Sequence, residues 1–381
     1  MNLIDGMKTS RLLICLFGCI GLTLSSCRPV VEPVDDPASL EELQSIDPET
    51  LKNRIDAVLD YTYEKRHLNT QDHAAWQILH GALTFQRDFK VKHEGELVSA
   101  VDYILAGGQM KGWTVERGTK YPNTDTGEDR YGLRAIMEPG TKAGQGHHDQ
   151  WLAVLSQCQL PPDTKIEVGR DTYTVADFVA QVQLDTSRNT DQEFSWTLIG
   201  LTGYLPSDAT WNDSFGKPWS IEKLVQAEVD HGFNSGACGG THRLIGMSMA
   251  LNRHEAAGGK VDGAWAGARE LIEEGIKTAQ SYQNPNGSFS TNYFLRSGSS
   301  PDLAEDLSTT GHTLEFLALS RTEEELKEEW MMRAADHMCE VFEKTEGIPL
   351  ECGALYHAAH GLALYRERMF GPREYGDKPA E

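Results

Sequence analysis

The strongest constraint on this chain is a unit that recurs six times, in which a short turn rich in glycine and polar residues leads into a nearly all-apolar helical stretch. Recurrence of one unit at a roughly regular spacing is the signature of a repeat architecture. Each turn also carries His, Cys, Asp or Glu, so ionisable groups are expected to gather at one end of successive helices. The six turns lie at residues 72–76, 146–151, 192–196, 238–243, 310–313 and 351–356.

Amphipathic stretches alternate with these apolar ones, as at residues 175–182, where apolar side chains recur at helical spacing. Thr174 and Ser220 stand where helix N-caps are expected. In a ring of helical hairpins an outer helix has one solvent face and an inner helix has none, and no period-2 strand pattern competes with this interpretation. We therefore predict an all-α domain, an (α/α)6 toroid of six helical hairpins over residues 49–372.

Two segments interrupt the regular spacing, at residues 107–146 and about 282–311, and both are rich in Gly, Asn, Asp, Ser and Thr. Each enters an inner helix at its N-terminal end. They are predicted to be long loop insertions over one mouth of the ring, where long loops over a cavity are more often functional than idle.

The N-terminus is predicted to be a lipoprotein export signal. Lys8 and Arg11 precede an apolar stretch at residues 12–24, which is too short to span a bilayer. It ends in Leu-Ser-Ser-Cys, which resembles the bacterial lipobox, so Cys27 is the predicted lipidated residue. The expected organisation is a signal peptide at 1–26, a Pro-rich tether at 27–48, the toroid, and a disordered tail at 373–381. The expected location is the periplasm-facing cell envelope, with the outer membrane favoured over the inner one.

Charge and cysteine content narrow the function classes. The chain has a formal net charge of −22, and such an acidic surface repels phosphate backbones, so nucleic acid is excluded as a partner. Besides Cys27, the exported part has Cys158, Cys238, Cys339 and Cys352. Four cysteines in an oxidising compartment allow two disulfides, but a core of this size does not need them.

Residues 283–289, Gln-Asn-Pro-Asn-Gly-Ser-Phe, resemble the Gln-x3-Gly-x-aromatic repeat of the terpenoid cyclase and protein prenyltransferase α/α toroids. In that superfamily the motif caps helix ends, so the resemblance implies a fold and not an activity. The Asp-rich acid motif of the cyclases and the Asp-x-Cys zinc segment of the prenyltransferases are not found here. The whole chain also resembles a group of bacterial exported lipoproteins on this fold, which supplies no activity.

Zinc is the candidate cofactor. Cys238 and His242 are spaced i, i+4 across a Gly-Gly turn, and Cys352 opens the sixth inner helix, where His357 and His360 follow. A catalytic zinc site uses three protein ligands and keeps one position open, so Cys238, His242 and Cys352 form the predicted ligand set. Two alternatives remain open, a Cys238–Cys352 disulfide and plain buried thiols.

The candidate catalytic residues stand at the same turns. His148 and Asp149 suit general acid and base work, with at most one of His147 and His148 facing a cavity. Glu193 adds a carboxylate. The complete candidate set is His148, Asp149, Glu193, His242, Arg243 and His312, in which Arg243 is an anion clamp or else an ion-pair partner of a nearby carboxylate.

Aromatic residues near the predicted mouth are candidates for substrate binding, because aromatic rings stack on sugar faces in (α/α)6 glycan-processing enzymes. They are Trp113, Trp151, Trp196 and Tyr356. We expect His148, Glu193, His242, His312 and Cys352 to line one connected cavity at one end of the ring.

The leading hypothesis is an envelope-anchored enzyme, or degenerate enzyme, acting on an extracytoplasmic glycan or similar polar polymer. A non-catalytic scaffold that binds a glycan or small molecule is the rival, and a terpenoid-type enzyme is a third alternative.

Overall fold

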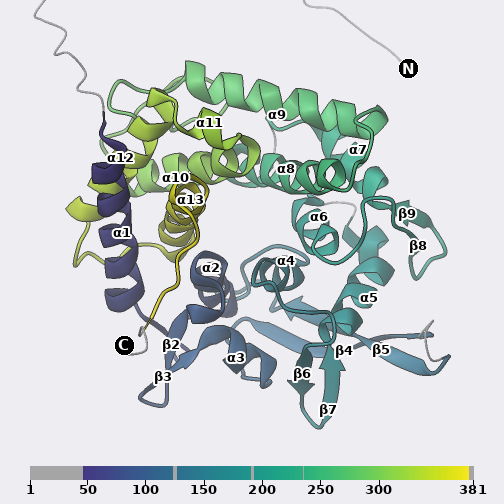
Figure 1. Ribbon diagram of the computed structural model, residues 1–381. Coiled ribbons are helices and arrows are strands. Elements are labelled where there is room, and N and C mark those ends of the chain that lie inside the picture. The colour runs from purple at the N-terminus through teal and green to yellow at the C-terminus, as the bar shows by residue number, and fades with distance from the viewer. Residues whose placement is uncertain (1–45, 123–126, 190–192, 235, 377–381) are drawn as a thin grey trace, which may run out of the picture. The chain divides into compact units, whose positions relative to one another are not determined.

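The computed structural model describes residues 46–122, 127–189, 193–234 and 236–376, which contain thirteen α-helices and nine short strands (Figure 1). The expected signal peptide, Cys27 and most of the expected tether lie outside the described residues. Helices dominate, as predicted, but the expectation of an all-α domain is wrong, because four small β-sheets lie between the helices. Within the described ranges, no helix combines the length and apolar character that crossing a membrane requires.

Six helices contact one another in a closed order. Each member packs on the next, from α2 through α4, α6, α8 and α10 to α13, and α13 packs on α2. Because these helices have neighbours on most sides, most of their residues are buried, and every residue of α6 is buried. Their bounds are α2 (Ala75–Phe85), α4 (Gln150–Gln157), α6 (Ser195–Thr202), α8 (Thr241–Ala256), α10 (Leu303–Ser320) and α13 (Cys352–Phe370).

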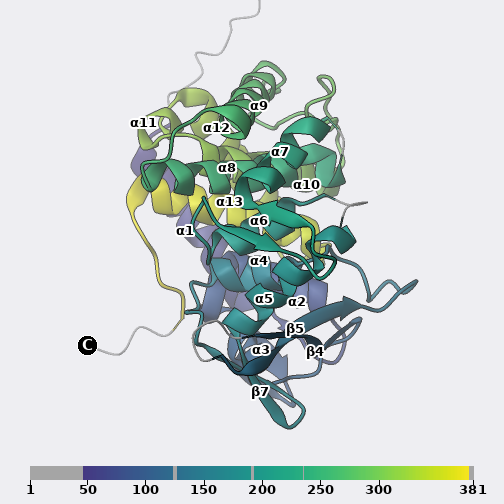
Figure 2. The same cartoon turned by 90° about the vertical axis from the view of Figure 1, so that its right-hand side faces the viewer.

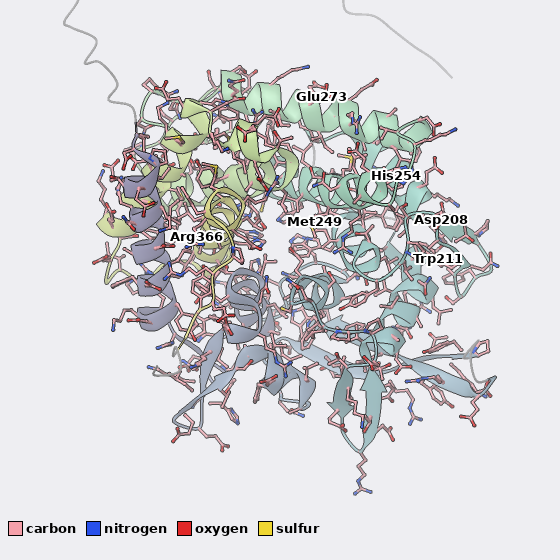
Figure 3. The ribbon with its side chains drawn as sticks, in the orientation of Figure 1. Asp208, Trp211, Met249, His254, Glu273 and Arg366 are labelled. Atoms are coloured by element: carbon pink, nitrogen blue, oxygen red, sulfur yellow. The ribbon has the colours of Figure 1, made fainter. Side chains whose placement is uncertain are left out.

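Amphipathic helices lie outside these six. They are α1 (Pro48–Lys65), α3 (Ala100–Leu105), α5 (Val175–Asp185), α7 (Ile221–His231), α9 (Gly263–Ser281) and α12 (Glu329–Lys344), with a short α11 (Glu323–Leu326). In both views α9 lies outside α8, and His254 of α8 stacks on Trp265 of α9 with ring centroids 4.0 Å apart (Figures 1, 2 and 3). The predicted N-caps are present, since Thr174 forms a capping box with Asp177 and Ser220 accepts from the backbone N–H of Lys223.

The strands form short hairpins beside the outer helices. β1 (Leu68–Asn69), β2 (Lys90–His93) and β3 (Glu96–Ser99) make one sheet, and the antiparallel pairs are β4 (Trp113–Pro122) with β5 (Asp129–Met137), β6 (Lys165–Val168) with β7 (Asp171–Thr174), and β8 (Thr210–Asn212) with β9 (Pro218–Ser220). Three short 3-10 helices complete the elements, η1 (Gln86–Asp88), η2 (Thr186–Asn189) and η3 (Ala237–Gly240).

The β4–β5 ribbon fills the first predicted insertion, and polar contacts help to dock it on α5. Arg134 Nε lies 2.7 Å from Asp185 Oδ2, and both Tyr121 and Arg130 donate to Asp177 Oδ1 at 2.7 Å. Apolar residues also alternate along the strands, since Leu133, Ala135 and Met137 pack on the core. The prediction of a loop insertion overlooked this short period-2 pattern.

Most of the recurring turns open an inner helix as predicted. Trp76, Trp151, Trp196 and His242 each occupy the second position of their helix, and Cys352 occupies the first position of α13. The prediction is wrong for His312, which lies in the middle of α10. That helix starts at Leu303 because Asp302 caps it, accepting from the backbone N–H of Ala304 at 2.9 Å.

The motif at residues 283–289 joins the ends of two outer helices. The amide of Gln283 donates to the carbonyls of Gly287 and Trp330 at 3.0 and 2.7 Å, and Phe289 meets the Trp330 ring edge-on. The arrangement links the end of α9 to the start of α12.

The end of the described chain differs from the expected disordered tail. Arg373 forms an ion pair with Asp56 of α1, and Tyr375 packs edge-on against Phe85 with ring centroids 4.9 Å apart. Arg366 of α13 pairs with the same Asp56 at 2.9 Å (Figure 3). Residues 373–376 are therefore held against α1 and α2.

Candidate functional site

A strained turn before α8 presents Cys238. Three successive residues adopt positive φ, with 49° at Cys238, 64° at Gly239 and 87° at Gly240. A Cβ atom on Gly240 would lie 1.6 Å from the carbonyl oxygen of Phe233, and one on Gly239 would lie 2.2 Å from the ring of Tyr293. Only glycine fits these two positions. A cysteine held in the left-handed region by such packing is the kind of strain that clusters at functional sites.

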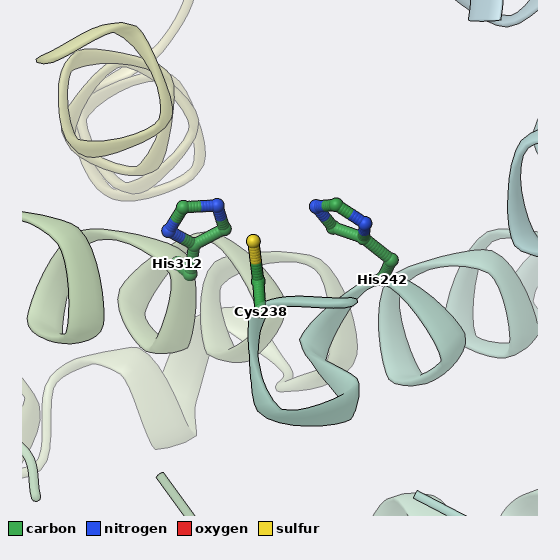
Figure 4. A group of neighbouring side chains, drawn as sticks. All are labelled: Cys238, His242 and His312. Atoms are coloured by element: carbon green, nitrogen blue, oxygen red, sulfur yellow. The ribbon is translucent and has the colours of Figure 1, made fainter. Parts of the chain in front are cut away.

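Three potential metal ligands converge on this turn (Figure 4). The ligand atoms of Cys238, His242 and His312 all lie within 4.8 Å of one another. His242 comes from the first turn of α8 and is 2 % exposed, and His312 comes from the middle of α10 and is 3 % exposed. The Nε2 atom of each ring is buried and has no hydrogen-bond partner among the described residues. A buried polar atom left in this state is unfavourable unless a ligand satisfies it.

Hydrogen bonds to the other ring nitrogen orient both imidazoles. His242 Nδ1 donates to Glu193 Oε1 at 3.2 Å, and His312 Nδ1 donates to the backbone carbonyl of Ser308 at 2.6 Å. When a ring is neutral, a proton on Nδ1 leaves its Nε2 lone pair directed into the interior, and a metal ion would have to displace the Nε2 proton of a charged His242. A carboxylate or backbone carbonyl behind the imidazole is the usual support of a metal-bound histidine.

Glu193 also joins His147 to the group. The Nδ1 atom of His147 lies 3.1 Å from Glu193 Oε1, and the His147 ring stacks on Trp196 at a centroid distance of 5.2 Å. Burial opposes the charge of Glu193, but hydrogen bonds from His147 and His242 outweigh it and hold the pKa of Glu193 well below its usual value. Burial likewise disfavours charge on His242, yet the neighbouring Cys238 and Glu193 raise the pKa of His242 well above its usual value.

The His147 side chain is 26 % exposed and Cys238 is half-buried, so this side of the group faces the solvent. His148, and not His147, was the predicted catalytic residue. No signal in the sequence distinguishes the two neighbours, because the choice depends on the direction in which the turn enters α4.

A second buried group lies next to the first. His357 and His360 of α13 donate through Nδ1 to the two carboxylate oxygens of Glu315, each at 2.7 Å. The His357 ring lies 4.0 Å from the His312 ring and 4.8 Å from the His80 ring, measured between centroids. The shared contact between His312 and His357 makes a continuous row of imidazoles across α8, α10, α13 and α2.

His148 and Asp149 lie elsewhere, on the wall of a pocket of about 340 Å³ between β5, α5 and the start of α4. His148 is exposed, and Asp149 Oδ2 accepts from the hydroxyl of Thr197 at 2.6 Å. Burial raises the pKa of Asp149 to about 6. The expected single cavity is therefore divided, with Glu193, His242 and His312 in the central group and His148 in the pocket beside it.

Arg243 is an ion-pair residue inside the protein. Its guanidinium lies 3.4 Å from Glu228 Oε2, and both side chains are buried. Glu228 also accepts from the backbone N–H of Phe194 at 2.6 Å and the hydroxyl of Ser195 at 3.0 Å. Arg243 and Glu228 thus fix the start of α6 beneath Glu193, and Glu228 was not among the carboxylates expected to pair with Arg243.

The four aromatic candidates do not share one wall. Trp113 and Trp151 line a pocket of about 140 Å³ with ring centroids 6.2 Å apart. Trp196 is buried against His147 and His242. Tyr356 is fully buried, and its hydroxyl donates to the carbonyl of Arg66 at 2.9 Å, so Tyr356 belongs to the core.

Cys352 is separate from the Cys238 group. Its sulfur accepts from the Gln77 amide at 3.4 Å, and burial raises the pKa of its thiol to about 11. The described cysteines Cys158, Cys238, Cys339 and Cys352 are all free thiols, so the alternative Cys238–Cys352 disulfide is absent. In the predicted ligand set, the place given to Cys352 is taken by His312.

The geometry thus defines a helix-rich protein with a buried thiol–imidazole group that opens to solvent on one side. Comparisons with protein-family profiles, curated proteins and solved structures gave no match. Function is accordingly inferred from the site itself.

Proposed function

We propose that this chain is a zinc-dependent enzyme of the cell envelope, built on an (α/α)6 toroid, that acts on an extracytoplasmic glycan or a similar polar substrate. The closed contact order of six inner helices, with amphipathic helices outside them, supports the toroid. The hydrogen bonds of Gln283, which link the end of α9 to the start of α12, support the toroid further. Envelope anchoring rests on the signal peptide predicted at residues 1–26 and on Cys27 as the predicted lipidated residue.

The observation that carries the zinc proposal is the convergence of one sulfur and two unpartnered Nε2 atoms from Cys238, His242 and His312. Zinc takes thiolate and imidazole ligands at about 2.0–2.3 Å, which places the ligand atoms roughly 3 to 4 Å apart in a tetrahedral site. The ligand atoms of the three residues lie within 4.8 Å of one another, so a shift of about 1 Å would bring them to that separation. Three protein ligands leave the fourth position open, as in catalytic zinc sites.

Zinc in such a site lowers the pKa of a bound water to about 7 and so supplies a nucleophile near neutral pH. The protein supplies the rest. Glu193 holds His242 in the tautomer that presents Nε2, and the same carboxylate positions His147. His147 is the more exposed imidazole of that pair and is placed to carry protons between the site and the solvent.

A second function follows from the same residues without metal. Cys238, His242 and Glu193 form a thiol, a base and an orienting carboxylate, the arrangement of a cysteine nucleophile. The observation that favours it is the strained turn, which exposes Cys238 just before the N-terminus of α8. The zinc proposal is preferred because it also satisfies the buried Nε2 of His312, which the thiol mechanism leaves unpaired.

Metal analysis of the purified protein tests the proposal. One zinc per chain is expected in the parent and in Cys352→Ser, and less than a tenth of that in Cys238→Ser and His312→Gln. Cys352→Ser is the matched control because Cys352 is another free thiol near the start of an inner helix and lies outside the Cys238 group. If the parent protein holds no stoichiometric metal but is alkylated rapidly at Cys238, the result would favour the thiol nucleophile. If the parent protein shows neither bound metal nor rapid alkylation, the result would favour a non-catalytic scaffold.

A further inference from the structure

The pocket beside α4 has the composition of a ligand site. Its apolar surface is formed by Leu133, Phe178 and Val182, and polar side chains with planar head groups stand around it, among them Arg134, Asp185 and Asn189. At about 340 Å³ it has room for a small ring with several polar substituents. An apolar floor with a few placed polar groups is typical of small-molecule sites in general.

Asp149 occupies the N-cap of α4 without capping it. Its backbone is left-handed, with φ 62°, and its side chain makes no capping hydrogen bond. Aspartate at an N-cap normally accepts from the first turn of its helix. Here the carboxylate turns instead toward Thr197 of α6 and lines the pocket. Thr197 is held in turn by Asn189, whose amide lies 2.8 Å from the Thr197 hydroxyl. The left-handed backbone and the missing capping hydrogen bond indicate that the Asp149 side chain is positioned for a contact outside its own helix.

The charges that face Asp149 come from three elements and one turn. Asp185 of α5 pairs with Arg134 of β5 and with Arg188 of η2, at 2.7 and 3.0 Å, and His148 stands next to Asp149 in the turn before α4. Two guanidinium groups therefore share one carboxylate. Asp149, with its pKa raised to about 6 by burial, is ionised in roughly nine molecules of ten at pH 7 and is then a hydrogen-bond acceptor.

We propose that this pocket binds a sugar unit and that Asp149 hydrogen-bonds one of its hydroxyl groups. Vicinal hydroxyls pair well with the planar head groups of Asp, Asn and Arg, while the apolar face of a sugar ring packs on the aliphatic and aromatic floor. The inference rests on the proposed function for its substrate class, and it adds the place where the glycan is held. His147 belongs to the central group and Asp149 to the pocket, so one short turn contributes to both.

Binding of tetrasaccharides tests the proposal directly. The probes are a neutral, an N-acetylated and a uronic acid tetrasaccharide (cellotetraose, chitotetraose and tetragalacturonate), each titrated into the parent, Asp149→Asn and Asp163→Asn. At least one probe is expected to bind the parent. Its affinity for Asp149→Asn is expected to be at least tenfold weaker, and its affinity for Asp163→Asn is expected to equal that for the parent, because Asp163 is an exposed acid away from the pocket. Asparagine tolerates the left-handed backbone and can still accept from Thr197, so the variant keeps the local fold.

The control for the zinc proposal is Cys238→Ser, which is expected to lose zinc and to keep the tetrasaccharide affinity of the parent. If Cys238→Ser loses zinc and still binds the tetrasaccharide, the two sites are separate. If the zinc proposal fails, the tetrasaccharide titrations still test the pocket. The pocket proposal is overturned if none of the three probes binds the parent at millimolar concentration, or if Asp149→Asn binds as tightly as the parent.

Labelling of carboxyl groups gives a second readout. A carbodiimide with an added amine labels accessible carboxyl groups, so Asp149 on the pocket wall and the exposed Asp163 are both expected to be labelled at pH 6. Saturating tetrasaccharide is expected to suppress the reaction at Asp149 alone. Labelling of Asp149 that the bound sugar does not slow would contradict the contact.

Discussion

The Nδ1 atom of His242 lies 3.2 Å from the Oε1 atom of Glu193, so one carboxylate decides which nitrogen of a buried imidazole is free to bind a ligand. The two residues are 49 positions apart in the chain. Glu193 precedes α6, and His242 opens α8. The pairing makes Glu193 a positioning residue for the proposed zinc site.

Replacing Glu193 with Gln is therefore expected to weaken zinc binding about 10- to 100-fold, the usual effect of removing a partner behind a metal ligand. A competition titration against a chromogenic chelator measures the affinity. Glu346→Gln, an exposed acid beyond the end of α12, serves as the control and is expected to leave the affinity unchanged. Equal affinities in parent and Glu193→Gln would remove the carboxylate from the site.

The Gly240 position is expected to tolerate no side chain. Gly240→Ala combines a positive φ of 87° with a Cβ atom 1.6 Å from the Phe233 carbonyl oxygen, and we expect a loss of unfolding free energy of about 3 kcal/mol. Gly258→Ala is the matched control, because its φ of 77° is similar and nothing lies within 4 Å of the added atom. That variant is expected to lose only about 1 kcal/mol. Urea unfolding monitored by circular dichroism compares them, and similar losses would show that the Phe233 contact relaxes without difficulty.

The buried carboxyl of Asp149 predicts a pH dependence of stability. Its folded pKa of about 6 is above the ordinary aspartate pKa of about 3.9, so between these two values the folded state binds more protons than the unfolded state. The stabilising contribution is present below about pH 4 and is lost as the pH rises through 6. Relative to Asp149→Asn, the parent is expected to lose on the order of 1–2 kcal/mol across that range, allowing for partial exposure. Unfolding curves of both proteins at pH 4, 5, 6 and 7 measure the difference, and a pH-independent difference would contradict the raised pKa.

Export as a lipoprotein predicts the behaviour of two cysteine variants. Cys27→Ala removes the residue that is predicted to receive the lipid. This variant is expected to accumulate as an unprocessed precursor, and no mature lipidated protein is expected in the membrane fraction. Cys15→Ala, within the apolar part of the predicted signal, is expected to be processed as the parent. Fractionation and intact-mass measurement distinguish the two, and normal processing of Cys27→Ala would rule out the lipobox.

Local sequence signals were sufficient for the helices and for the regions where polar groups gather. Turns rich in glycine and polar residues placed the starts of α2, α4, α6, α8 and α13 within a residue or two, because caps and left-handed turns act over a few neighbouring residues. The same logic failed at α10, where the cap at Asp302 starts the helix well before His312. It also missed the β4–β5 ribbon, whose alternating apolar residues Leu133, Ala135 and Met137 form only a short period-2 run.

The composition of the site was decided by tertiary structure. The sequence by itself determined that Cys238 and His242 are neighbours, since i, i+4 spacing and a glycine turn are local properties. It did not determine that His312, and not Cys352, completes the group. That choice depends on which face α10 and α13 turn toward Cys238, and hence on how all six inner helices close on one another. Tertiary structure also decides between His147 and His148. His147 contacts Glu193 and His148 lines the pocket, and a shift of one residue in the turn before α4 would exchange these two positions.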